Sequence, residues 1–226
     1  MELSDSISQY RTDADDKVEP YLSSDEEVTA WLNEAEEEAA IRARLLFDSS
    51  TTAVCDIAVS AGAVTAGTRV YALHESVFEI TRAVFIPTGS TTEYDLYLTD
   101  RVEQDRAYPG WRNLVDIPHQ LIVDDTKIEL GCKPSVAGII RIECYRTPLV
   151  KIEDSTNETP EINRVHHRFL VHWVLHRAYN RPDSQIFDPG RAEREEALFT
   201  QQFGIRPDAN NRRDVQANRE HHNRAW

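Results

Sequence analysis

The sequence predicts an α+β protein: a small helical bundle, an antiparallel β barrel or sandwich inserted into it, and an extended C-terminal tail. Apolar residues recur at helical spacing near both ends of the chain, short β-branched and aromatic runs fill the middle, and the last residues are polar and rich in arginine. We therefore expect a helical domain of residues 1–50 and 151–204, a β-rich domain of residues 51–150 and a tail of residues 205–226.

Composition and charge exclude several classes of protein. With 40% hydrophobic and 28% charged residues, the chain has a globular composition, and no apolar run is long enough to span a membrane. The first residues do not resemble a secretory signal. The formal net charge of −14 argues against nucleic-acid binding, which needs a basic surface. Three widely spaced cysteines without a CxxC pair predict reduced, buried thiols in a cytosolic protein.

Two helices are predicted at the N-terminal end. Ser4–Asp16 is a short one with few apolar side chains, and the segment 20–24 ends it. Ser24 and Glu27 have the spacing of a capping box, and Ser23 with Glu26 is the alternative register. Apolar residues then recur at helical spacing through Asp25–Phe47. The many glutamates of this second helix are interpreted as a solvated face.

The middle of the chain predicts short antiparallel strands separated by polar turns. A Pro-Gly turn at residues 108–111 places Trp111 where we expect it to pack on the sheet. This spacing of strands is typical of a small barrel or sandwich. The expected strands are residues 54–59, 69–73, 76–85, 93–99, 117–123, 127–130 and 139–145.

The segment Pro160–Tyr179 predicts the central helix of the fold. It is apolar on nearly every side, which is typical of a helix inside a fold or an assembly. Pro182 follows it and stops the helical pattern. A last helix is expected over Pro189–Phe203, because Asp188 can cap its start and Gly204 can end it.

The ends of the chain carry opposite charge. The first 40 residues are strongly acidic, whereas the polar segment Asp208–Trp226 is rich in arginine. These surfaces either attract each other between neighbouring copies, meet differently charged partners, or are simply solvated. We expect the tail to be disordered alone and to fold on a partner, and Trp226 is a natural anchor for a pocket.

No motif of this chain indicates an active site. His172 and His176 lie four residues apart on one helix face, as in zinc proteases, but the glutamate base and a third ligand are missing. The alternative is that both histidines are hydrogen-bonded at a helix–helix or subunit contact. Neither a nucleophile elbow nor a phosphate-binding loop occurs. We therefore expect no catalytic residue, cofactor or metal, and favour a structural protein.

Three stretches of the sequence resemble the head-tail adaptor (connector) proteins of tailed bacteriophages: SSDEEVTAWLNEAEEEAAIRARLL near the start, HHRFLVHWVLHRAYNRPDSQIFD in the last third, and FGIRPDANNRR after it. The resemblance implies a structural virion protein, not an enzyme, that assembles in the host cytoplasm. It implies a ring, usually of twelve copies, on the portal vertex that links the capsid to the tail. The β-rich insertion departs from the smallest members, which are nearly all helix.

The resemblance also implies partners and site residues. The tail from Arg206 to Trp226 is expected to dock on the portal protein, and the outer or lower faces are expected to receive the next tail component. The β-rich insertion is expected to contact a tail fibre, a nozzle protein or the neighbouring subunit. Genome DNA would pass through the lumen without specific binding, past acidic helices, and no membrane is involved. The portal-binding residues expected on this basis are Arg206, Arg212, Arg213, Arg219, Arg224 and Trp226.

Two other functions stay open at this point. One is a metal-dependent hydrolase, such as a virion-associated cell-wall enzyme, that uses His172 and His176. The other is a non-viral binding module whose β-rich domain is the working part.

Overall fold

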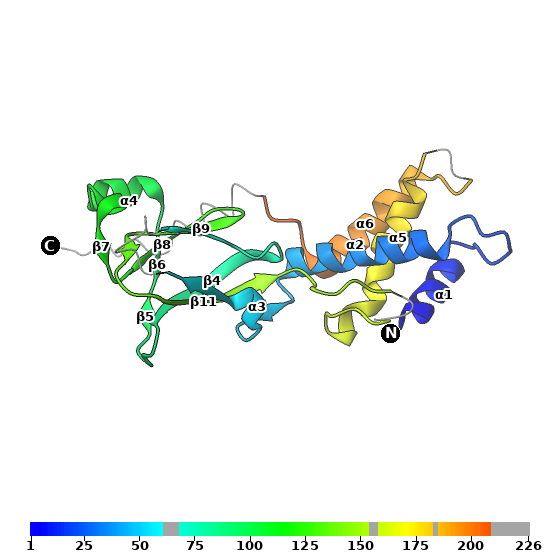
Figure 1. The fold of residues 1–226 in the computed structure, drawn as a ribbon. Coiled ribbons are helices and arrows are strands. Elements are labelled where there is room, and N and C mark those ends of the chain that lie inside the picture. The colour runs from blue at the N-terminus through cyan, green and yellow to red at the C-terminus, as the bar shows by residue number, and fades with distance from the viewer. Residues whose placement is uncertain (61–67, 154–157, 183–184, 209–226) are drawn as a thin grey trace. The chain divides into compact units, whose positions relative to one another are not determined.

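The computed structural model describes residues 1–60, 68–153, 158–182 and 185–208. The chain forms two compact units (Figure 1): a helical unit of Met1–Leu46 and Thr147–Arg206, and a β unit built on Phe47–Arg146. The mixed α+β class predicted from the sequence is confirmed.

The helical unit is built around α5, as the apolar pattern predicts. Within the described residues it contains α1 (Leu3–Asp13), α2 (Asp25–Ala43), the 3-10 turn η2 (Arg164–His166), α5 (His167–Tyr179) and α6 (Pro189–Phe203). Helix α5 packs against α1, α2 and α6. Most of its turns contribute buried side chains, among them Leu170, Val171, Val174, Leu175 and Ala178.

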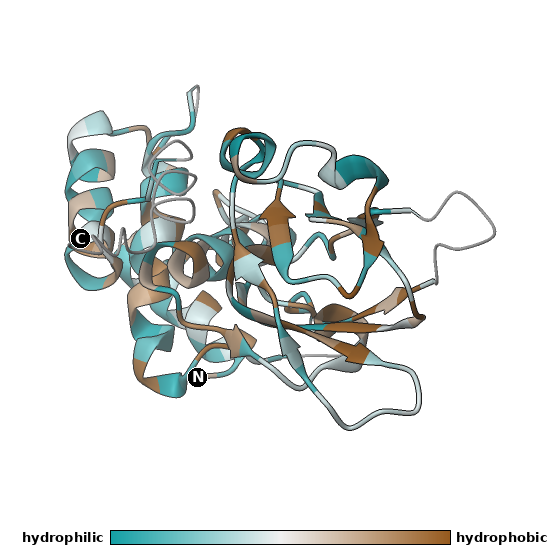
Figure 2. Ribbon diagram, turned by 90° about the vertical axis from the view of Figure 1, so that its left-hand side faces the viewer, coloured by the Kyte–Doolittle hydropathy of each residue, from teal (hydrophilic) through white to brown (hydrophobic). Residues whose placement is uncertain are grey.

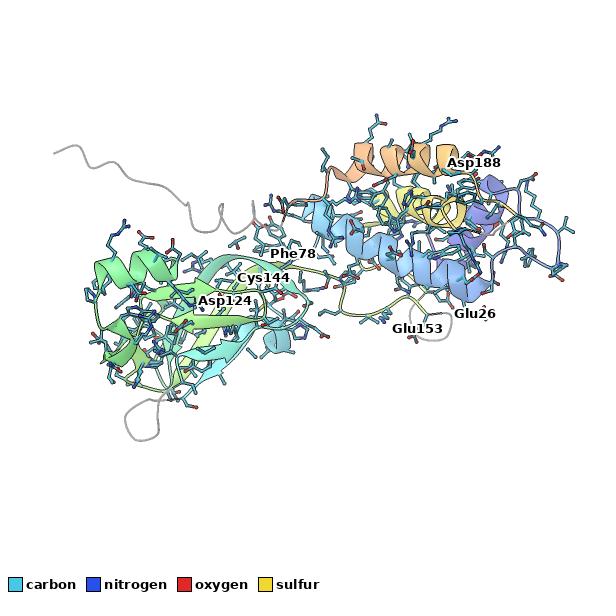
Figure 3. The ribbon with its side chains drawn as sticks, turned by 90° about the horizontal axis from the view of Figure 1, so that it is seen from above. Glu26, Phe78, Asp124, Cys144, Glu153 and Asp188 are labelled. Carbon is cyan, nitrogen blue, oxygen red and sulfur yellow. The ribbon has the colours of Figure 1, made fainter. Side chains whose placement is uncertain are left out.

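Local signals set most helix ends. At the start of α2 the Ser24 hydroxyl accepts a hydrogen bond from the Glu27 N–H at 3.2 Å, and the Glu27 carboxylate accepts one from the Ser24 N–H at 3.1 Å, so the predicted capping box is present. The carboxylate of Asp188, labelled in Figure 3, caps α6 by accepting hydrogen bonds from the N–H groups of Gly190 and Arg191, each at 3.1 Å. Helix α2 ends at Ala43 rather than at Phe47, because Arg44 adopts a left-handed conformation with φ 51°.

Side chains of α2 hold the chain where it returns to the helical unit. The Asn33 amide pairs with both backbone groups of Ile152, at 2.7 and 3.1 Å. The Glu36 carboxylate accepts hydrogen bonds from the backbone N–H groups of Glu161 and Ile162, at 2.5 and 3.1 Å. Asn163 then caps the 3-10 turn η2, accepting the Val165 N–H at 3.1 Å, and α5 begins after this turn, later than the predicted start at Pro160.

Glu36 gives the helical unit a predictable dependence on pH. Its side chain is 1% exposed, and this burial raises the pKa from 4.5 to about 7, although the two backbone N–H groups oppose the shift. The folded state therefore binds a proton more tightly than the unfolded state does. Stability from this group is greatest below about pH 4.5 and declines as the pH rises through about 7.

We expect replacement of Glu36 by glutamine to remove this dependence. The wild-type unfolding free energy should fall by about 3 kcal/mol from this group between pH 4.5 and 7.5, and Glu36→Gln should not show that decline. Urea unfolding followed by circular dichroism across this range is the measurement. The exposed neighbour supplies a matched control, Glu37→Gln, which should retain the wild-type profile. Parallel profiles for wild type and Glu36→Gln would contradict the prediction.

The β unit consists of short strands around one long central pair. The strands are β1 (Phe47–Asp48), β2 (Asp56–Val59), β3 (Val70–Ala72), β4 (Val77–Pro87), β5 (Tyr94–Asp95), β6 (Tyr97–Leu98), β7 (Val115–Asp116), β8 (Gln120–Val123), β9 (Lys127–Leu130), β10 (Lys133–Pro134) and β11 (Gly138–Arg146). The helical elements between them are α3 (Thr52–Cys55), α4 (Arg101–Ala107) and the 3-10 turn η1 (Trp111–Asn113).

These strands form three open sheets in the described part of the chain. One has the order β1-β11-β4-β5, with β2 also on β11, the second has the order β3-β9-β8-β6, and the third pairs β10 with β7. No closed barrel forms from them, so the predicted barrel or sandwich is not confirmed. Two short pairs, β6 with β8 and β7 with β10, are parallel rather than antiparallel.

Apolar side chains of the two larger sheets and of the neighbouring turns form the core of the β unit. Hydrophobic segments mark the strands in Figure 2, and the fully buried residues include Phe85, Leu121, Ile128 and Ile140. Trp111 is 1% exposed, as predicted for the Pro-Gly turn. The three cysteines are free and buried, and burial raises the pKa of Cys132 to about 11 and that of Cys144 to about 12.

Candidate interaction site

Of the predicted portal-binding site, the structure describes the start of the C-terminal tail, where the chain leaves α6. Helix α6 ends at Phe203, and Gly204 follows with φ 85°, a conformation that residues with a Cβ rarely adopt. Ile205 is 82% exposed. The next side chain, Arg206, turns back to the helical unit, where its Nη1 lies 2.5 Å from Oε1 of Glu38.

The carboxylate that receives Arg206 belongs to a buried network. The second oxygen of Glu38 pairs with Nε of Arg42 at 2.9 Å, and the side chains of both residues are less than a tenth exposed. Arg42 also donates to the Thr200 hydroxyl of α6 at 3.0 Å, and its guanidinium lies 5.0 Å from the ring centroid of Trp173 and 5.2 Å from that of Phe199.

This network fixes the start of the tail. Arg206 is 60% exposed on its own, so an isolated surface pair would contribute little. Its partner Glu38, however, is held by Arg42, which is packed on aromatic rings of α5 and α6. The tail therefore leaves the helical unit at a defined point.

The sequence predicts Arg206 as a portal-binding residue but does not predict its contact with Glu38. Glu38 was grouped with the solvated glutamates of residues 25–47, whereas the structure buries it at 7% exposure. The spacing of Glu38 and Arg42, four residues apart on one helix, is the signal that indicates an ion pair there. The remaining predicted site residues lie outside the described part of the chain: Arg212, Arg213, Arg219, Arg224 and Trp226.

His172 and His176 contact the neighbouring helix. Nδ1 of His172 lies 2.7 Å from a carboxylate oxygen of Glu195, and Nδ1 of His176 lies 2.9 Å from the backbone oxygen of Ala192. Both partners belong to α6. This is the helix–helix contact that the sequence offered as the alternative to a zinc site.

No group of three or more histidine, cysteine, aspartate or glutamate side chains suited to a metal ion is found in residues 1–60, 68–153, 158–182 and 185–208. The same residues contain no helix that is long and apolar enough to cross a membrane.

An open groove runs along the helical unit between α1, α2 and the segment 151–153. Its volume is about 960 Å³, and Ile7 and Ile152 are among its lining residues. Acidic side chains that line it include Glu26 and Glu153, labelled in Figure 3. Arg11, Lys17 and Lys151 also line it, so the groove has no single charge.

A family model described as SU10 adaptor protein matches residues 1–222, which is nearly the whole chain. No curated protein matches the chain in sequence.

Proposed function

The chain belongs to the SU10 adaptor protein family, a family of phage head-tail adaptors, and from this premise we propose that it forms a ring on the portal vertex and links the capsid to the tail. The family gives it a structural role among virion proteins of the head-tail junction. We further propose that the C-terminal tail docks on the portal protein through Arg206, Arg212, Arg213, Arg219, Arg224 and Trp226.

One observation carries the proposal: the family model extends through both units and into the tail, ending at residue 222. The Arg206–Glu38 contact supports the role of the tail, because an anchored starting point reduces the entropy that the tail loses when it orders on a partner. Arginine and tryptophan are also the side chains most enriched at the energetic centres of interfaces.

The proposal divides the remaining roles between the parts of the chain. The helical domain of residues 1–50 and 151–204 forms the ring, and the inserted domain of residues 51–150 is available to a downstream tail, nozzle or fibre protein. Exposed acids of α2, such as Glu26 and Glu37, suit a lumen that DNA crosses without adhering. A ring structure with α2 on the outer surface would contradict this lumen role.

Light scattering of the dilute chain, alone and mixed with the cognate portal ring, tests the proposal. We expect a mass for the mixture that corresponds to several copies loaded on each portal ring. An unchanged portal mass at every ratio would overturn the portal-docking proposal.

A further inference from the structure

Most described arginines of this acidic chain are paired with carboxylates, and two of the exceptions lie close together, in η2 and in the first turn of α5. On the helical unit, Arg177 pairs with Glu34 at 3.1 Å and Arg181 pairs with Glu27 at 2.8 Å. Arg164 and Arg168 are exposed, and no carboxylate of the described residues lies within ion-pair distance of either guanidinium. The chain thus presents free positive charge at this place despite its net charge of −14.

Exposed apolar side chains accompany these arginines. Val165 lies between them in sequence and is 65% exposed. The ring of His166 contacts that of Phe203 at 5.8 Å, which brings the end of α6, and with it the exposed Ile205, to the same end of the helical unit. We name Arg164, Val165 and Arg168 the arginine patch. Charged groups around exposed apolar side chains are typical of a surface that another chain covers.

The nearby acids do not neutralise the arginine patch by direct pairing. Glu2 and Asp5 form the capping box of α1, each accepting a backbone N–H, and Glu161 accepts the Leu149 N–H at 3.0 Å.

A surface of opposite charge lies at the other end of α5. The Tyr179 hydroxyl, at the last residue of α5, donates to the Asp13 backbone oxygen at 3.3 Å, which places the loop after α1 at this end. Three exposed acids, at the last residue of α1 and in that loop, form no ion pair with any residue that the structure describes, and Val18 beside them is 79% exposed. We name this set the acidic loop: Asp13, Asp15 and Glu19.

The two surfaces are about 20 Å apart along α5, which has 13 residues. They cannot meet within one copy of the helical unit. Two complementary surfaces at opposite ends of one subunit generate head-to-tail contacts, which close into a ring when the rotation between subunits allows it.

We propose that the arginine patch of one copy binds the acidic loop of the next copy, so that this contact joins neighbouring subunits. The inference rests on the proposed ring and identifies the contact that builds it. Val165 and Val18 form the apolar centre of the contact, and the charges around them set its direction. The contact weakens with salt, because it depends on exposed charges.

Charge reversal in the isolated chain tests this contact without the portal. The first variant carries Arg164→Glu with Arg168→Glu, the second carries Asp13→Lys, Asp15→Lys and Glu19→Lys, and the third combines all five substitutions. Sedimentation velocity at high protein concentration and low salt should show wild-type association beyond dimers. Each single-surface variant should associate at least about tenfold more weakly than wild type. The third variant should regain association, because both surfaces are reversed together.

The test has a matched control and two outcomes that would contradict the inference. Arg194 on α6 is also exposed and has no carboxylate partner among the described residues, so Arg194→Glu should associate like wild type. All substituted side chains are exposed, and circular dichroism verifies folding. Wild-type chains that do not associate at low salt, or five substitutions that fail to restore association, would overturn the inference. Because the portal is absent, portal docking is judged separately by light scattering.

Discussion

Removing residues 209–226 is expected to abolish loading of the chain onto the portal ring while leaving its unfolding unchanged. The truncated chain keeps Asp208 and the contact of Arg206 with Glu38, and among the described residues the last core residue of the helical unit is Phe203. Interface tryptophan and arginine side chains often cost about 2 kcal/mol or more each when truncated, so affinity should fall by at least about a hundredfold. Light scattering with the portal ring measures the loss, and thermal unfolding verifies the fold.

Reversing the charge of the four tail arginines tests whether loading onto the portal ring depends on the charge of the tail or on its length. Substitution of glutamate at Arg212, Arg213, Arg219 and Arg224 should reproduce most of the loss. Arg194→Glu again serves as the control, because it changes the charge of an exposed arginine outside the tail. A truncated chain that loads onto the portal as well as the full chain would refute the assigned role of the tail.

Replacing Asp48 by asparagine is expected to destabilise the β unit by about 3–5 kcal/mol, because it removes a buried charge that Arg146 and two backbone N–H groups stabilise. Asp48 is 5% exposed, and its Oδ2 lies 2.6 Å from Nε of Arg146. The other oxygen accepts the backbone N–H groups of Ser50 and Thr51, both at 3.0 Å. One carboxylate thus connects β1, the last residue of β11 and the turn before α3.

The pH dependence of this effect has a defined sign. Burial alone would raise the pKa of Asp48, but hydrogen bonds from Thr51, Arg146 and Ser50 outweigh it and hold the pKa well below its usual range. The stabilisation is therefore present above about pH 4 and is lost as the pH falls further. We expect the free-energy gap between wild type and Asp48→Asn to narrow below about pH 4.

An exposed pair in the same unit supplies the control for Asp48. Asp56 and Arg141 are joined by two hydrogen bonds of 2.8 and 3.2 Å, but the arginine is 44% exposed. Asp56→Asn should cost about 1 kcal/mol or less. Urea unfolding of both variants measures the difference. Equal losses for the buried and the exposed pair would contradict the explanation by burial.

Helices with strong local signals could be predicted closely from the sequence. The observed α6 has the predicted bounds, Pro189–Phe203, because its cap, its proline and its terminal glycine all lie within the chain segment itself. The start of α5 could not be found in this way. The segment before the helix is held by the Glu36 carboxylate, which accepts the N–H groups of Glu161 and Ile162 and lies more than 120 residues away in sequence.

In the β unit, the sequence pattern alone does not predict every helix and strand pairing. The strand at Lys127–Leu130 was predicted with its observed bounds, whereas α4 was missed between the strand and turn signals around it. The parallel pairs of β6 with β8 and β7 with β10 depend on long-range packing rather than on turn residues. In the candidate site, the charge of the tail is the reason for predicting Arg206. Its partner Glu38 lies 168 residues earlier, too far for a local sequence pattern to indicate the contact.

The pairing of β1 with β11 also bears on how such chains diversify. Phe47 lies opposite Tyr145 in that pair, so the chain enters and leaves the β unit at two backbone positions only about 5 Å apart. A few residues suffice to bridge that distance, and the helical unit has its own core. The whole segment between them is therefore exchangeable as a cassette: recombination there can replace one β unit with another, or with a short turn, and leave the helical core intact.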